Sequence, residues 1–210
     1  VAAADAPKTI DNMAVQGSYI VMLPIRSANG MLTTRLALIP RSADVSFGYL
    51  EYTQANLLRQ AFKLLGDRYG QGGLFDGRDD GMLIQDLYAS FGICLPREGS
   101  RQAQAAGNPD TLARTAALSE LEEADKLETI AGLKAGAILY MDGHVMLYLG
   151  QSDNTPYVLH AAERLSVSQG ADSAPESYDV NTVAVSDLGV YHNNGQTYLT
   201  NLSACASIGS

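Results

Sequence analysis

The chain has few side chains that can act as nucleophiles, general bases or metal ligands. Among its 210 residues, cysteine occurs only at positions 94 and 205, and histidine only at positions 144, 160 and 192. His144 follows an Asp-Gly turn and His160 ends the apolar run YVLH, whereas His192 lies in the turn-like YHNNGQ. An isolated histidine is most often just a hydrogen-bonded side chain. Two histidines on adjacent strands, however, can serve as a general base and the residue that orients it.

The glycine-rich segment 70–81 supplies a third candidate element. It ends in GRDDG directly before an apolar helical stripe, so Asp79 and Asp80 fall at the N-terminus of a helix. A thiol at such a position has a lowered pKa, because the positive end of the helix dipole favours the thiolate. Here the residues are carboxylates, which are also preferred helix caps. The sequence leaves both a functional role and a purely capping role open.

Hydrophobic periodicity predicts the elements that position these residues. Apolar residues at helical spacing predict helices, and short apolar runs bounded by turns predict strands. The predicted helices cover residues 55–65, 83–91 and 119–130. The predicted strands cover residues 137–141, 145–149, 157–161, 182–185 and 197–202, and the polar residues 166–178 are predicted to form a loop. Upstream, two apolar stretches around Asn29-Gly30 predict a β-hairpin over residues 18–40.

Composition excludes several classes of protein. The formal net charge of −9 leaves no large basic face, so we expect no nucleic-acid partner and no electrostatic binding to membranes. No run approaches the roughly 18 consecutive apolar residues of a membrane span. Two cysteines cannot form a four-thiolate zinc site. We expect no cofactor.

Five motifs in order resemble one family. They are YGxGG at Tyr69, RDxxxLIQDLY, FGIxLPR ending at Arg97, LKAGAILYMDGHVMLYLG around His144 and YVLHA around His160. In combination they resemble the NlpC-type cell-wall peptidases, papain-like cysteine peptidases (hydrolases) of bacterial envelopes. The resemblance implies an α+β, papain-like fold for residues 51–210, with N-terminal helices packed on an antiparallel sheet. Residues 1–50 resemble the end of a bacterial SH3-type barrel, and we expect them to form a small β appendage.

The resemblance also implies a function and a set of site residues. It implies a bacterial envelope protein that binds a peptidoglycan stem peptide or muropeptide and cleaves the bond between γ-D-glutamate and the diamino acid. His144 matches the family's general base and His160 its orienting residue. Tyr69 matches a tyrosine that lines the site, and Asp79 matches an aspartate that in one subgroup helps to hold the free amine of the substrate. Arg97 is a further candidate for lining or bracing the groove, although pairing with an acidic neighbour is the favoured interpretation.

The family's nucleophile is missing from this chain. Alignment on the motif Asp-Cys-Ser-Gly-Leu places Asp80 at the cysteine and Gly81 at the serine. Gln71 replaces the tryptophan of the glycine-rich loop, and Gly99 replaces the serine that is expected after Leu-Pro-Arg. Both cysteines of the chain lie elsewhere, so neither restores the mechanism.

Three hypotheses follow from the aspartate at position 80. Attack by its carboxylate on an amide would form a high-energy anhydride, and an ion pair with His144 would hold the general base protonated. The first hypothesis is therefore a pseudoenzyme that keeps the fold and binds a muropeptide. An active hydrolase that works by an unanticipated route is one alternative. The other is a metal site, since Asp80, His144 and His160 have the composition of a two-histidine, one-carboxylate triad.

Overall fold

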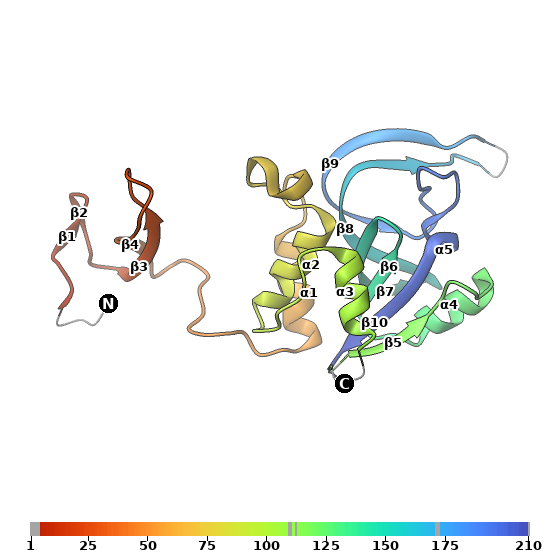
Figure 1. Cartoon of the computed structure of the whole chain (residues 1–210), viewed down its shortest axis with the longest axis horizontal. Helices are drawn as coiled ribbons and strands as arrows, with labels where there is room; N and C mark the ends of the chain where they lie inside the picture. The colour runs from red at the N-terminus through yellow and green to blue at the C-terminus, as the bar shows by residue number, and fades with distance from the viewer. Residues whose placement is uncertain (1–4, 109–110, 112, 171–172, 210) are drawn as a thin grey trace. The chain divides into compact units, whose positions relative to one another are not determined.

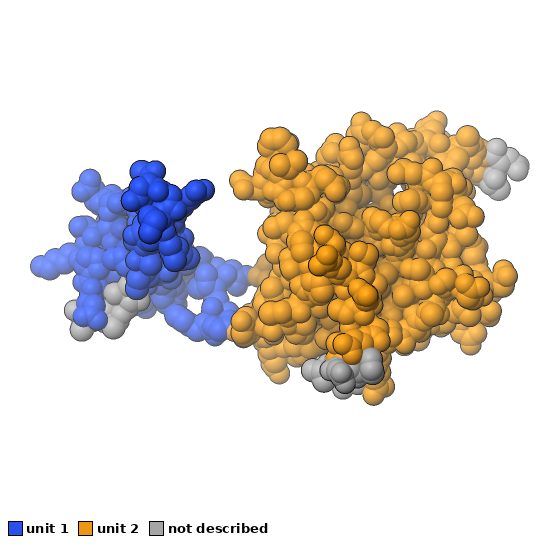
Figure 2. Space-filling model, viewed as in Figure 1, with its two compact units in different colours: residues 1–48 blue, residues 49–210 orange. Residues whose placement is uncertain are grey.

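The structure is a computed structural model of the chain that describes residues 5–108, 111, 113–170 and 173–209 (Figure 1). The chain divides into two compact units, residues 1–48 and residues 49–210, which Figure 2 shows in separate colours. The boundary lies in the segment that joins the N-terminal strands to the first helix.

The N-terminal unit contains two antiparallel strand pairs. β1 (Thr9–Ile10) pairs with β2 (Met13–Ala14), and β3 (Ser18–Arg26) pairs with β4 (Leu32–Pro40) over the whole length of both strands. The turn between β3 and β4 contains Gly30 at φ +82°, a left-handed conformation that glycine adopts without a side-chain clash. The predicted hairpin around Asn29-Gly30 is thus confirmed.

The larger unit is built on an antiparallel sheet. Within the described residues the strand order is β5-β10-β6-β7-β8-β9. The strands are β5 (Ala113–Ala117), β6 (Ile138–Met141), β7 (His144–Ser152), β8 (Thr155–Val167), β9 (Glu176–Asp187) and β10 (Leu202–Ile208). Leu147 of β7 pairs with Leu159 of β8, so His144 and His160 lie on the same face of adjacent strands, two positions out of register.

The helices of this unit are mostly short, and side chains cap several of them. They are α1 (Gln54–Lys63), the 3-10 segment η2 (Gln71–Asp76), α2 (Asp80–Ala89), α3 (Gly99–Ala106), α4 (Glu123–Ala131) and α5 (Tyr198–Asn201). Thr53 caps α1 by accepting a hydrogen bond from the backbone N–H of Asn56. Asp79 caps α2 in the same way. The N-terminus of α2 is therefore fixed at the residue before Asp80.

Period-two alternation along the central strands divides the core between the two faces of the sheet. One face carries Ile138, Tyr140, Val145 and Leu147, which pack with apolar residues of α1 and α2. The other face carries Leu139, Met141, Met146 and Tyr148, which pack with Ile130 of α4 and Tyr198 of α5. Figure 1 shows α1, α2 and α3 gathered beside the sheet. The predicted α+β fold, with helices packed on an antiparallel sheet, is confirmed.

Two predictions of local structure are wrong. Residues 198–201 form the helix α5 and not a strand, because the Thr197 side chain accepts the backbone N–H of Thr200 and closes a helical turn. The expected loop 166–178 is shorter than predicted, since β8 continues to Val167 and β9 begins at Glu176. The sequence patterns also miss α3 and β5, which have few large apolar residues from which a period could be read.

Candidate active site

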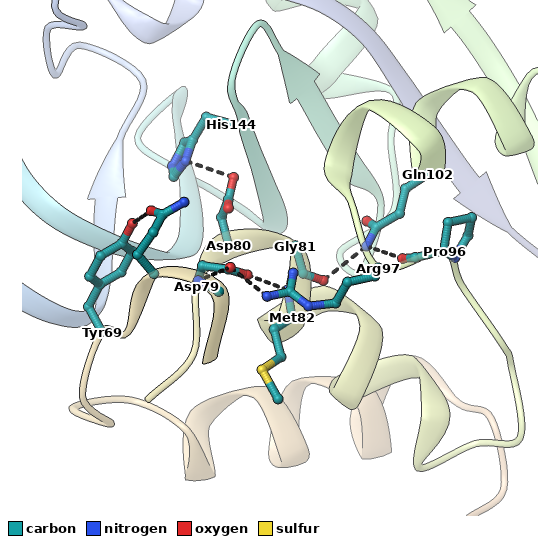
Figure 3. Close-up of polar contacts among 11 residues, drawn as sticks. Tyr69, Asp79, Asp80, Gly81, Met82, Pro96, Arg97, Gln102 and His144 are labelled. Carbon is teal, nitrogen blue, oxygen red and sulfur yellow. Dashed lines mark hydrogen bonds and ion pairs between the residues drawn. The ribbon is translucent and has the colours of Figure 1, made fainter. Parts of the chain in front are cut away.

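Asp80 lies at the first position of α2 and faces the sheet. Its Oδ2 is 3.1 Å from Nδ1 of His144 and accepts a hydrogen bond of 2.9 Å from the backbone N–H of Val145 (Figure 3). The carboxylate thus ties the helix N-terminus to the start of β7. Both the helix dipole and these two donors favour its negative charge.

The two histidines continue this contact as a hydrogen-bonded chain. Nε2 of His144 is 2.8 Å from Nδ1 of His160, and Nε2 of His160 is 3.0 Å from the hydroxyl oxygen of Ser186. The Ser186 hydroxyl donates to the carbonyl of Asp187 at 2.9 Å. Ser186 is not predictable from the sequence, because a lone serine in a polar strand carries no recognisable signal.

Counting the donors in this series of hydrogen bonds assigns the protons on the ring nitrogens of His160. Because Ser186 donates its only proton elsewhere, it accepts from Nε2–H of His160. His160 is fully buried, and its burial, followed by the nearby His144, lowers its pKa well below 6.5, so it is neutral. Its Nδ1 therefore accepts from Nε2–H of His144. On the other side of the ring, Nδ1 of His144 faces Oδ2 of Asp80, which also accepts the backbone N–H of Val145.

Both carboxylate oxygens of Asp79 accept hydrogen bonds from within the protein. Oδ1 accepts the N–H of Met82, and Oδ2 accepts the N–H of Gly72 and Nη2–H of Arg97 at 2.6 Å. Burial by itself raises the pKa of Asp79, but these hydrogen bonds and the Arg97 charge outweigh it and lower the pKa. The residue is 6% exposed. In this structure Asp79 joins the glycine-rich loop, α2 and the segment after it.

Arg97 pairs with Asp79, as the favoured interpretation of the sequence predicts. Its backbone also approaches α2 closely, because a Cβ on Gly81 would lie 2.6 Å from the Arg97 carbonyl oxygen. Gln102, buried in α3 and missed by the sequence analysis, donates to the carbonyls of Gly81 and Pro96 (Figure 3). Glycine at position 81 is therefore required by this packing, where the family motif has serine.

A polar cavity of about 230 Å³ opens beside Asp80 and His144. Its lining residues include Tyr69, Gln71, Gly143, Glu163, Arg164, Tyr191, His192, Asn193 and Tyr198. Tyr69 donates its hydroxyl proton to Gln71, the residue that stands in place of the loop tryptophan. Tyr69, Asp80 and His144 thus line one cavity. Asp79 and Arg97 pair with each other next to it and are not part of its lining (Figure 3).

Tyr198 is a site residue that the sequence analysis missed, because it assigned residues 197–202 to a strand. Its ring centroid lies 5.5 Å from that of His144 and 5.6 Å from that of His160. Burial, followed by the charge of Asp80, raises the pKa of Tyr198 to about 12. The ring packs against both imidazoles and limits how they can rotate. The hydroxyl stays protonated at neutral pH.

The geometry does not favour the metal alternative. His144 uses one nitrogen towards Asp80 and the other towards His160, so the three side chains form a line and do not converge on one point. Among the residues that the structure describes, no three His, Cys, Asp or Glu side chains are arranged to hold a metal ion.

The fold and the site together define a class of protein: an α+β, papain-like domain in which a helix N-terminus faces two histidines of a sheet. Residues 66–184 match the model of the NlpC/P60 family. This match covers more than half of the chain, so the chain belongs to the NlpC/P60 family. No curated protein matches the chain.

One solved structure supports the fold, and two others are similar to the chain at lower TM-scores. An NlpC/P60 endopeptidase from Photobacterium damselae subsp. piscicida has a TM-score of 0.65 and 16% identity, over 90% of this chain and 46% of its own. The chain thus spans about half the length of that endopeptidase. The P60 domain of antigen MAP1204 from M. avium subspecies paratuberculosis has a TM-score of 0.41 and 16% identity, over 71% of this chain and 91% of its own. RipD from Mycobacterium tuberculosis has a TM-score of 0.40 and 16% identity, over 67% of this chain and 95% of its own. It is described as a non-catalytic NlpC/p60 domain protein adapted to peptidoglycan binding.

Proposed function

We propose that this chain is a peptidoglycan-binding member of the NlpC/P60 family that lacks peptidase activity. One observation carries the proposal: Asp80, which aligns with the nucleophile of the family motif, lies with its Oδ2 3.1 Å from Nδ1 of His144, which aligns with the base. The expected ligand is a stem peptide or muropeptide of the bacterial envelope. A helix long and apolar enough to cross a membrane is absent from the described residues.

The Asp80–His144 pair supplies neither the nucleophile nor the general base that amide cleavage needs. A carboxylate that attacks an amide forms an anhydride, which lies high in energy relative to the thioester that a cysteine forms. Both nitrogens of His144 are engaged within the protein, Nδ1 with Asp80 and Nε2 with His160, so neither is free to take a proton from an attacking group. The arrangement therefore supports a site that is intact in its geometry but lacks peptidase activity.

The surroundings of the pair support retained binding. The cavity beside Asp80 and His144 is open, and polar side chains from the glycine-rich loop, β8 and the segment before α5 line it. Asp79 and Arg97 maintain this geometry through their ion pair and do not themselves reach into the cavity. We also propose that residues 1–50 derive from a bacterial SH3-type barrel, on the strength of the sequence resemblance and the strand pairs β1–β2 and β3–β4.

Incubation with L-alanyl-γ-D-glutamyl-diaminopimelate tests the proposal. We expect no release of L-alanyl-γ-D-glutamate, as followed by liquid chromatography and mass spectrometry, together with measurable binding of the peptide by calorimetry. Turnover that His144→Ala abolishes would show an active hydrolase and refute the loss of activity. Failure of the peptide to bind at millimolar concentration would refute the binding role.

A further inference from the structure

Tyr198 depends on other elements for its position in the site. It is the first residue of α5, a helix of four residues, and so short a helix is not stable by itself. The backbone N–H of Tyr198 donates to the carbonyl of Val190 at 2.8 Å. That of Leu199 donates to the carbonyl of Leu188 at 3.0 Å. These bonds fix the start of α5, and its end must also be held if the ring is to keep its place beside the two site histidines.

Helix α4 holds the end of α5 through two side chains. Nζ of Lys126 donates to the backbone carbonyl of Thr200 at 2.6 Å and to that of Leu202 at 3.0 Å. A carboxylate oxygen of Glu123 accepts the hydroxyl proton of Thr200. These contacts join α4 to α5 and to the residue that follows it, so they fix the end of α5 relative to α4.

The burial of Lys126 makes its contacts informative. The residue is 3% exposed, which is rare for lysine, because a buried amino group loses its hydration. An apolar side chain of similar length would fill the same space without that cost. The carbonyls of Thr200 and Leu202 replace the lost hydration, and they do so only when α5 is in its observed position. The amino group therefore defines where α5 ends, which packing alone would not.

We infer that α4 positions Tyr198 through Lys126 and Glu123, and that Lys126 is thereby a positioning residue for the site. Lys126 is not among the described residues that line the cavity, so it acts through α5. The ring of Tyr198 lies against the imidazoles of His144 and His160 and lines the cavity beside them. A displaced α5 would let both imidazoles turn and would change the cavity wall.

The imidazole signals in NMR spectra of the ligand-free protein test the inference. Tyr198→Leu removes the aromatic ring and defines the shift that its loss produces. Lys126→Met keeps the length of the side chain, and we expect it to shift the His144 and His160 signals in the same direction by at least about half as much. In the Tyr198→Leu background it should add little. A purely structural role of Lys126 would lower the free energy of unfolding but leave these signals in place.

Lys134→Met is the matched control. It removes the same amino group from an exposed position after α4 and should leave both signals unchanged. If Lys126→Met does not fold, Glu123→Ala at an exposed position of the same helix takes its place and should shift the signals in the same direction. Unchanged signals in folded Lys126→Met, or in Glu123→Ala where that variant is used, overturn the inference.

Binding of L-alanyl-γ-D-glutamyl-diaminopimelate extends the test, and this part rests on the proposed function. By calorimetry, Lys126→Met and Tyr198→Leu should each raise the Kd about fivefold, and the double variant should raise it by no more than about the same factor, because both changes act on one ring. Additive losses of binding free energy overturn the inference. Absence of binding to the wild type refutes the proposed function and leaves the result from the imidazole signals intact.

Discussion

Asp80 preserves the resting electrostatics of a cysteine peptidase site. A thiolate and a carboxylate both place one negative charge at a helix N-terminus, within reach of a neighbouring histidine. The 3.1 Å contact with His144 and the N–H of Val145 would serve either anion. What differs is reactivity, because the carboxylate is stable and the thiolate is nucleophilic.

The first prediction concerns Asp80→Cys in a Cys94→Ser background. The new thiol would meet the helix N-terminus and His144, so its pKa should fall and the thiolate should dominate near pH 6. We expect iodoacetamide to alkylate it at pH 6 at least about tenfold faster than it alkylates exposed Cys94 of the wild type. Mass spectrometry measures both rates. Adding His144→Ala should remove the advantage, and equal rates without that change would show that the site does not activate a thiol.

His160 makes folding stability depend on pH. Its pKa is lowered in the folded state by burial and then by His144, whereas in the unfolded chain it is near the ordinary value of 6.5. Below pH 6.5 the unfolded chain therefore binds a proton that the folded protein does not. The stabilisation from a neutral His160 is complete above pH 6.5 and is lost as pH falls towards the folded-state pKa.

The second prediction follows from this titration. Between pH 6.5 and 5, the free energy of unfolding of the wild type should include a loss of up to about 1.4 kcal/mol per pH unit that His160→Gln lacks. Urea denaturation at pH 7, 6 and 5 measures the two slopes. His192→Gln, which changes a histidine in a surface turn, serves as the control and should retain the wild-type slope. Parallel slopes for the wild type and His160→Gln would contradict the buried neutral histidine.

At the scale of elements, the sequence predicted those segments whose apolar period is strong. Helix α2 and strands β6 and β7 are buried on well-defined faces, so their patterns are clear. The segment TYLTNL is short and partly apolar and follows a turn, which suggested a strand, but Thr197 caps a helical turn there, and Tyr198 was consequently missed. The meeting of Asp80 with His144 depends on contacts between distant segments, which only the family resemblance could predict.

The third prediction tests the packing of α1 on the sheet. Gly136 has φ +98°, and a Cβ there would lie 2.4 Å from Cδ2 of Leu57 in α1. Its carbonyl accepts the hydroxyl proton of Tyr88 in α2, so the backbone cannot easily move away. Gly136→Ala should lower the free energy of unfolding by about 3 kcal/mol, from overpacking plus left-handed strain. Urea denaturation measures the loss.

Gly195→Ala is the matched control for this change. Gly195 has φ +78°, but nothing lies within 4 Å of an added Cβ, so only backbone strain of about 1 kcal/mol should appear. Equal losses of the free energy of unfolding in the two variants would mean that Leu57 can move away from the added methyl group at no energetic cost. The close contact between Gly136 and α1 would then not contribute to stability.

At the scale of the whole molecule, the two units differ in how much core each possesses. Both apolar clusters consist of residues from the larger unit, and Ile10 is the only buried apolar residue before position 49 among those described. In residues 1–48 several large side chains are exposed, Phe47 at 85% and Leu32 at 79% among them. A strand pair with so little buried surface has marginal stability of its own.

The fourth prediction follows from this imbalance. A fragment of residues 49–210 should unfold cooperatively with a Tm within about 2 °C of the full chain, because it retains every residue of both clusters. A fragment of residues 1–48 should show no cooperative transition by circular dichroism. The 49–210 fragment should also bind the stem peptide with unchanged affinity, since the whole cavity lies within it. A fall in Tm of more than about 5 °C, equivalent to roughly 1 kcal/mol or more, would show that residues 1–48 stabilise the larger unit after all.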